Sequence, residues 1–229
     1  MFLVGSLFFG SGFSALLYQI TWQRSLFTIF GINVEAVTVV VTGFLLGLGF
    51  GSLLGGRLSR ATRINLLALF GMIELAIGLF GFASLSIFRW VGAHTLMLPA
   101  AMTTAATIAL VFAPTLLMGA TLPILAQFLV RRVMNVGRTV GLLYGVNTLG
   151  SASACFASGL WLMGHLGMQK VVLFAAAINL VVAIVALSLA RRGRRETGLP
   201  IEIPKSSAEV PSCIGLSFSF LFIIAALTG

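Results

Sequence analysis

The chain has 229 residues, of which 59% are hydrophobic and only 8% are charged, and its mean hydropathy is +1.12. This composition excludes a water-soluble globular protein and indicates an integral membrane protein. The net charge of +9 does not indicate nucleic-acid binding, because the basic residues stand in short clusters between apolar stretches, as topology signals do.

Apolar stretches that could cross a bilayer, which takes roughly 20 residues, recur along the chain. The sequence therefore predicts an all-α, polytopic transmembrane bundle with six complete spans and the start of a seventh. In chain order the predicted spans are Phe2–Trp22, Ala36–Leu54, Ile64–Phe88, Met97–Val130, Val140–Leu160, Val171–Ala190 and Cys213–Gly229. Residues 1–190 are expected to form the bundle. Because the run 213–229 stops in mid-span, we expect the full protein to continue with a second half.

The first span, Phe2–Trp22, begins without the positive charge of a secretory signal peptide, so we expect it to remain in the membrane as a helix. Its far end carries a cluster of polar and aromatic residues, Tyr18, Gln19, Trp22, Gln23 and Arg24. Tyr and Trp commonly anchor helices at the lipid headgroups, which is the interpretation we favour. A ligand site that includes Gln19 is the alternative.

The second span carries four glycines at intervals of four residues: Gly43, Gly47, Gly51 and Gly55. They leave one helix face without side chains, and a neighbouring helix can approach closely along it. Small residues form a similar face on the fifth span: Gly141 and Gly145, then Gly150, Ala154 and Ser158. We favour static close packing over the sliding surface of a moving transporter, because small-residue interfaces are common in membrane bundles.

The third span contains Glu74, one of only five acidic residues in the chain. An ionised carboxylate is costly in hydrocarbon, so we expect this side chain to face the bundle interior and to be protonated or paired. Glu74 either binds a proton or a cationic substrate, or makes a structural hydrogen bond between helices. The sequence leaves both interpretations open.

The fourth span contains Pro114 and Pro123, each of which removes a backbone donor and predicts a kink or a local opening of the helix. An opened helix can expose backbone groups to a substrate, but ordinary proline kinks are the interpretation we favour. On the fifth span, Tyr144 and Asn147 lie three residues apart and share a helix face. There we favour hydrogen bonding between helices over a substrate site.

The basic residues predict the orientation of the bundle. Most of the 14 Lys and Arg residues follow the second, fourth and sixth spans, namely Arg57, Arg60, Arg63, Arg131, Arg132, Arg138, Arg191, Arg192, Arg194, Arg195 and Lys205. The positive-inside rule then places these loops and the N-terminus in the cytoplasm. Residues 191–212 combine arginines with prolines, a composition typical of a solvated cytoplasmic linker.

The sequence contains no glycine-rich nucleotide loop, Walker sequence, Ser-His-Asp set or pair of carboxylates. Cys155 and Cys213 are too few for a disulfide framework, and His94 and His165 lack further ligands at metal spacing. We therefore expect no cofactor, no metal and no catalysis by this chain alone. The expected partners are the lipid bilayer and other membrane subunits or a second membrane half.

Four motifs resemble the membrane region of the bacterial fused membrane-spanning spermidine-synthase-like proteins. They are Phe13–Arg24 (FSALLYQITWQR), Gly51–Leu58 (GSLLGGRL), Pro114–Pro123 (PTLLMGATLP) and Gly141–Gly150 (GLLYGVNTLG). The resemblance covers essentially the whole chain. It implies that the chain is the first of two membrane halves in the bacterial inner membrane, with an aminopropyltransferase-like domain elsewhere in the full protein.

By this resemblance the chain is a membrane anchor, a scaffold or an accessory subunit, and it contains none of the catalytic residues of that domain. The loop Arg57–Arg63 is also similar to the loop between spans two and three of major facilitator transporters, although Ser59 stands where aspartate is usual. A facilitator-like half is thus the expected architecture. The alternative function is half of a transporter for a small cationic or polyamine-like solute, with Glu74 as the intramembrane site.

Overall fold

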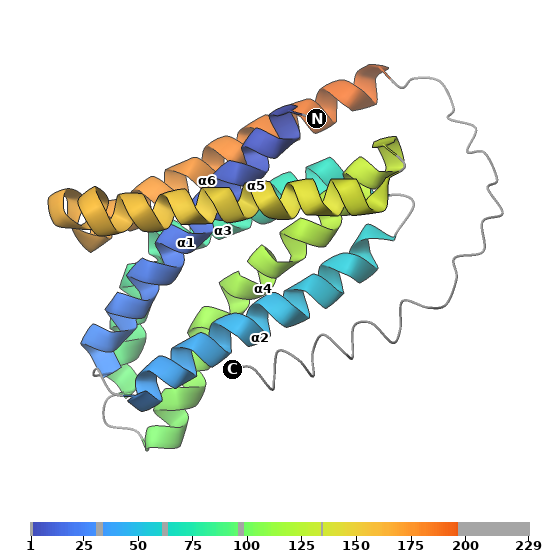
Figure 1. The fold of residues 1–229 in the computed structure, drawn as a ribbon. Coiled ribbons are helices and arrows are strands. Elements are labelled where there is room, and N and C mark those ends of the chain that lie inside the picture. Colours follow the sequence, from blue (N-terminus) through green and yellow to red (C-terminus); the bar gives the residue numbers. More distant parts are fainter. Residues whose placement is uncertain (1, 31–33, 61–63, 96–98, 134, 197–229) are drawn as a thin grey trace. The chain divides into compact units, whose positions relative to one another are not determined.

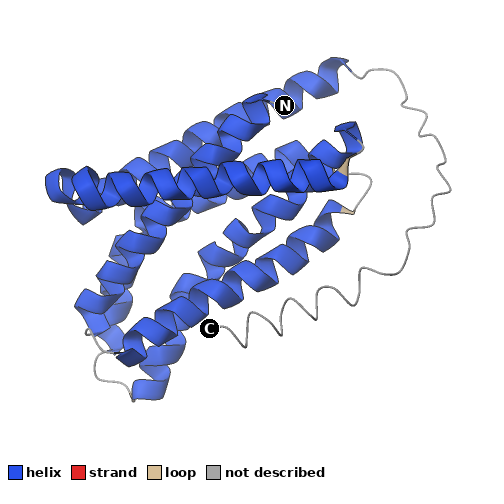
Figure 2. Ribbon diagram, viewed as in Figure 1, coloured by secondary structure: helices blue, strands red, loops and turns tan. Residues whose placement is uncertain are grey.

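A computed structural model describes residues 2–30, 34–60, 64–95, 99–133 and 135–196, and these residues are almost entirely helical, with no strand among them (Figures 1 and 2). The prediction of an all-α fold is therefore confirmed for this part of the chain. The helices are α1 (Phe2–Phe30), α2 (Val34–Ser59), α3 (Leu66–Thr95), α4 (Ala100–Val133), α5 (Val136–Ala157), the π-helical segment η1 (Ser158–Leu162) and α6 (Met163–Glu196). The predicted run 213–229 and most of the predicted linker lie outside the described residues.

Five stretches of the described residues are long and apolar enough to cross a membrane, not the predicted six: Phe2–Thr28, Val37–Ser59, Leu66–Thr95, Met102–Arg131 and Val136–Arg192. The predicted gap between the fifth and sixth spans is helical, so the two runs merge into one of 57 residues. A straight helix of that length would extend about 85 Å, roughly twice the thickness of a whole bilayer. Length and hydropathy therefore support five apolar stretches among the described residues, and not six separate ones.

The merged run does not stay straight, because Gly167 interrupts it with φ 73° and ψ 165°. Positive φ is strained for residues that carry a Cβ, so glycine suits this position. Figure 1 shows that the chain turns back in this region, and α5 and α6 run in opposite directions.

Several helices also extend beyond the predicted boundaries. The first helix continues eight residues past Trp22, to Phe30, and the sixth continues past Ala190, to Glu196. The first residues of the predicted linker are therefore helical. A helix satisfies its own backbone hydrogen bonds in lipid and in water alike, so hydropathy alone does not mark its end.

Two helix starts follow a familiar sequence signal. Before α3, Asn65 Oδ1 accepts hydrogen bonds from the backbone N–H groups of Leu67 and Ala68, at 3.2 Å each. Before α5, Asn135 Oδ1 accepts from the N–H of Arg138 at 3.0 Å. Asparagine is favoured as an N-cap because its side chain satisfies the free amides of the first turn.

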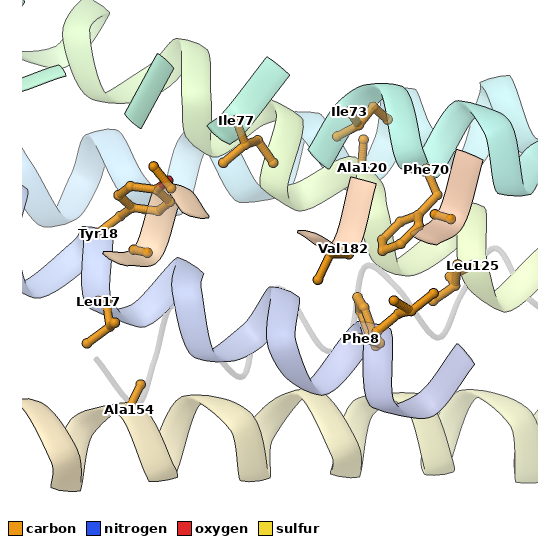
Figure 3. Close-up of a cluster of buried hydrophobic side chains, with 14 of the residues drawn as sticks. Phe8, Leu17, Tyr18, Phe70, Ile73, Ile77, Ala120, Leu125, Ala154 and Val182 are labelled. Carbon is orange, nitrogen blue, oxygen red and sulfur yellow. The ribbon is translucent and has the colours of Figure 1, made fainter. Parts of the chain in front are cut away.

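The helices pack in pairs, α2 on α4, α3 on α6 and α1 on α5, with α3 also against α4 and α1 against α6. Buried aromatic side chains fill the interior. The rings of Phe8 (α1) and Phe70 (α3) meet edge to face with centroids 6.4 Å apart, and Figure 3 shows them beside Leu125 of α4. Edge-to-face packing suits the charge distribution of aromatic rings.

The arginines that predict the orientation lie at one end of the helices. Arg57 is in the last turn of α2, Arg138 is near the start of α5, and Arg191 and Arg192 are near the end of α6. Figure 1 shows the C-terminal ends of α2, α4 and α6 on the same side. In α4, Arg131 Nη2 donates to the carbonyl oxygen of Ser59 at 3.0 Å and so joins the ends of α2 and α4. Arg63 lies outside the described residues, as do the side chains of Arg132, Arg194 and Arg195.

Candidate functional site

Two buried hydrogen bonds between side chains join α1 and α3. Ser11 of α1 meets Glu74 of α3, and Trp22 meets Ser84, at sequence separations of 63 and 62. The nearly constant separation means that the two helices run parallel and stay in register. Gly81 of α3 leaves space for the Tyr18 side chain, because a Cβ at this position would collide with the Tyr18 hydroxyl.

Glu74 lies at the centre of this contact and is 0% exposed. Its Oε1 accepts a hydrogen bond from the Ser11 hydroxyl at 2.5 Å, while Oε2 has no hydrogen-bond partner. No Lys, Arg or His of the described residues pairs with it. A buried oxygen without a partner costs free energy, so the placement of this carboxyl group is not explained by stability alone.

Two further buried polar atoms near Glu74 also lack partners: the hydroxyl of Tyr18 and Oδ1 of Asn179. Tyr18 is 0% and Asn179 2% exposed. Asn179 belongs to α6, and its Cβ lies 3.4 Å from where a Cβ would stand on Gly78, one turn along α3 from Glu74. Three helices therefore each contribute one unsatisfied polar atom to the same region. We call Glu74, Tyr18 and Asn179 the buried polar triad.

Sequence reasoning missed Asn179 and misplaced Tyr18. Asn179 is a polar residue inside an apolar run, and that was the available signal. The headgroup-anchor interpretation is wrong for Tyr18 and Trp22, because both side chains are fully buried. Trp22 stacks on Tyr18 with ring centroids 4.7 Å apart, and its Nε1 donates to Ser84 Oγ at 3.0 Å. Helix α1 continues beyond this pair, which leaves both rings deep in the bundle.

The other predicted site residues do not gather around Glu74. Gln19 is partly buried on α1. Tyr144 is 63% exposed on the outside of α5. Asn147 turns instead toward α1, where its Oδ1 lies 2.5 Å from the position that a Cβ on Gly12 would take. Although they are three residues apart, Tyr144 and Asn147 thus have different surroundings.

The glycines of α2 lie against α4. A Cβ on Gly51 would collide with the Leu116 carbonyl, and one on Gly119 would collide with the Leu48 carbonyl, so the two backbones touch. Gly47 and Gly55 lie equally close to α4, and Gly43 is in ordinary contact with it. Helix α4 runs from Ala100 to Val133 as one helix, and neither of its prolines interrupts it.

The fifth helix follows the prediction of close packing only in part. A Cβ on Gly141 or on Gly145 would meet nothing within 4 Å, so these two glycines do not form the close contact expected of them. The contact is made by Gly150, whose Cβ would collide with the Phe9 carbonyl of α1, and by Gly12 against Asn147. The hydroxyl of Ser151 also donates to the Gly12 carbonyl at 3.1 Å.

The described residues include no group of three or more His, Cys, Asp or Glu side chains that could hold a metal ion. Compared with known proteins, the chain matches no family model, no curated protein and no solved structure. Any function must therefore be argued from the bundle and from the buried polar triad.

Proposed function

We propose that this chain is a non-catalytic membrane domain that crosses the bacterial inner membrane six times and serves as a scaffold for another membrane unit. In this proposal α5 and α6 cross separately, because the run Val136–Arg192 folds back at Gly167. The arginine-bearing ends of α2, α4 and α6 lie in the cytoplasm by the positive-inside rule. The partner is a second membrane half or a spermidine-synthase-like subunit, as the sequence resemblance implies.

The observation that carries the scaffold proposal is the backbone contact between α2 and α4. Glycines at intervals of four residues bring the two helices together along Gly47–Gly55. On α4, Gly119 lies against the backbone of Leu48 in the same contact. Contacts of this kind leave no side chains to rearrange between the helices, which favours a rigid pair over a sliding one. The outward face of α2 carries large apolar side chains, among them Leu45, Phe50 and Leu53, which lipid or a partner helix can cover.

The six-crossing topology is tested by single-cysteine variants labelled with a membrane-impermeant reagent in cells. Arg60→Cys and Gly193→Cys should be modified from the cytoplasmic face, and Arg24→Cys, at the far end of α1, from the opposite face. If residues 60 and 193 react from different faces, α5 and α6 do not cross as a pair and the proposal fails.

The scaffold role is tested by intact-mass measurement and by purification from native membranes. A polypeptide near 24.2 kDa would exclude a fused synthase domain and leave the accessory-subunit version. That version requires a stoichiometric partner with an aminopropyltransferase-like domain or a second membrane half. A chain of this mass that purifies without any such partner would contradict the scaffold role.

A second candidate function is transport of a small cation, and the buried polar triad favours it. Glu74 Oε2 and Asn179 Oδ1 are acceptor atoms without donors, and the Tyr18 hydroxyl, which can donate or accept, has no partner either, in a place where water is scarce. A proton or a small cation with N–H donors would complement them. For either ligand to enter, the helices α1, α3 and α6 must separate, because all three residues are at most 2% exposed.

Uptake of radiolabelled polyamines into proteoliposomes tests this candidate. Glu74→Gln keeps the shape of the side chain and removes its charge, so flux should fall at least tenfold. Ser153→Ala is the matched control, because Ser153 is exposed and donates only to the Leu149 carbonyl of its own helix. Absence of flux in the wild type, or equal flux in Glu74→Gln, would reject transport at this site.

A further inference from the structure

The contact between α1 and α5 opens toward the N-terminal ends of the two helices. The backbones touch where Gly12 meets Asn147 and Gly150 meets Phe9. On the N-terminal side of that contact lies a groove of about 480 Å³, a volume in the range of small-molecule sites. The groove is lined by Phe2, Gly5, Ser6, Phe9, Leu142 and Val146.

The walls of this α1/α5 groove suit hydrocarbon. Ser6 is the one hydroxyl-bearing residue among those lining it, and this hydroxyl already donates to the Phe2 carbonyl of its own helix at 3.2 Å. Gly5 would place a Cβ in open space, with no atom within 4 Å. The groove therefore offers empty volume between apolar side chains, without a polar group that needs a partner.

A positive charge lies one helical turn before the residues of α5 that line the groove. Arg138 precedes Leu142 by four residues, so it lies on the same side of α5, one turn nearer to the helix start. Its side chain is exposed, and its guanidinium forms no hydrogen bond or ion pair with the described residues. The N-terminus of α5, capped by Asn135, adds the positive end of the helix dipole.

The distance along α5 from Arg138 to the backbone contact is close to the thickness of one leaflet of a bilayer. From Arg138 to the backbone contact at Gly150, α5 rises about 18 Å at 1.5 Å per residue. One leaflet of the hydrocarbon core is about 15 Å thick. A chain that begins at the arginine and follows the groove would thus end near the middle of the membrane.

We propose that the α1/α5 groove binds one anionic phospholipid, with an acyl chain between Phe2, Phe9 and Leu142 and the phosphate group at Arg138. The proposal rests on the membrane placement proposed above. A lipid fits these observations better than a partner helix, because an unpaired guanidinium at the interface needs an anion and the walls below it need only hydrocarbon.

The test uses the full chain, reconstituted in vesicles of equal phosphatidylglycerol and phosphatidylcholine and then released for native mass spectrometry. The wild type should retain one phosphatidylglycerol in preference to phosphatidylcholine. Arg138→Gln should lower this preference about fivefold, the effect of one basic residue near a membrane surface. Arg24→Gln, the same charge change at the other end of α1, should leave it unchanged.

A second pair of variants tests the groove itself. Gly5→Leu fills the groove and should abolish retention of either lipid. Gly164→Leu is the matched control, because at either glycine an added Cβ meets no atom within 4 Å. The thermal unfolding of both variants is measured beside that of the wild type, to show that they are folded.

The possible failures are distinguishable. Equal retention of the two lipids by the wild type, equal effects of Arg138→Gln and Arg24→Gln, or full retention in Gly5→Leu would overturn the lipid site. A protein helix that occupies the groove in place of lipid, seen as a stoichiometric subunit lost in Gly5→Leu, would overturn it as well. Each of these results is compatible with the proposed membrane domain. A chain recovered free of membranes would contradict both the membrane domain and the lipid site.

Discussion

The contacts between α2 and α4 and between α1 and α5 use the same arrangement of backbone atoms. In each pair, a glycine on each helix lies against a backbone carbonyl of the other helix. The carbonyl belongs to the residue three positions before the other helix's own contacting glycine. The four contacts are Gly51 with Leu116, Gly119 with Leu48, Gly150 with Phe9 and Gly12 with Asn147. The same backbone contact therefore occurs twice between the first three helices and the last three. Helix α4 corresponds to α1, and α2 corresponds to α5.

The two pairs differ in how far the contact extends. Helix α2 repeats its glycines at intervals of four, so they drift only about 40° around the helix from one to the next and stay on the side of α4. On α5, Gly145 and Gly150 are five residues apart, which places them about 140° apart around the helix. Gly145 therefore faces away from the side of α5 on which Gly150 meets α1, and the α1/α5 groove lies on the N-terminal side of that contact. The extent of a backbone contact between two helices thus depends more on which helix face the glycines occupy than on how many glycines there are.

The largest effect is expected for Gly51→Ala. The added methyl group would collide with the Leu116 carbonyl and carbon atoms, in a pair held together along several turns. Such overpacking should lower the free energy of unfolding in detergent by about 3 kcal/mol. Gly49→Ala is the control on the same helix, because its Cβ would meet no neighbour. Equal stability of the two variants would show that α2 and α4 are not in backbone contact.

A smaller effect is expected for Gly150→Ala in the α1/α5 pair. Its methyl group would meet the Phe9 carbonyl, but among the described glycines only Gly12 and Gly150 bring the backbones of α1 and α5 together, fewer than between α2 and α4. The free energy of unfolding should fall by about 1.5 kcal/mol, measured in the same detergent. A loss as large as that of Gly51→Ala would mean that the α1/α5 pair is as constrained as α2 and α4.

Ser151→Ala probes the polar part of the same pair. It removes the hydrogen bond from the Ser151 hydroxyl to the Gly12 carbonyl, which lies directly at the backbone contact between α1 and α5. Hydrogen bonds between membrane helices contribute about 0.6 kcal/mol on average, and a loss of that size is expected. Ser153→Ala is the control, because the Ser153 hydroxyl donates to the Leu149 carbonyl of its own helix. This variant should have the same free energy of unfolding as the wild type.

The smallest effect is expected for Gly141→Ala and Gly145→Ala. Neither methyl group would meet an atom within 4 Å, and alanine favours a helix over glycine by about 0.5 kcal/mol or more. Both variants should therefore unfold at the same or a slightly higher temperature. Destabilisation as large as that of Gly150→Ala would restore the sequence-based assignment of these two glycines to the helix contact.

Residue patterns predicted parts of the site and missed others. Glu74 could be singled out because a carboxyl group in an apolar run is rare, and it does face the interior. Its partners could not be predicted, since Ser11 lies 63 residues away and only the parallel register of α1 and α3 brings the two together. Tyr18 and Trp22 resembled interfacial anchors because composition does not show that α1 continues well past them.

The amino-acid sequence by itself determined that this protein is a bundle of apolar helices, because hydrocarbon admits no unpaired backbone and roughly 20 apolar residues suffice to cross it. It also determined that the arginines gather at the ends of alternate helices. Only the tertiary structure decided which glycines bring backbones together, where the run Val136–Arg192 turns back, and that Asn179 and Tyr18 join Glu74. Those features depend on the rotation of each helix about its axis and on its register against its neighbours, and both are set by packing between residues far apart in the chain.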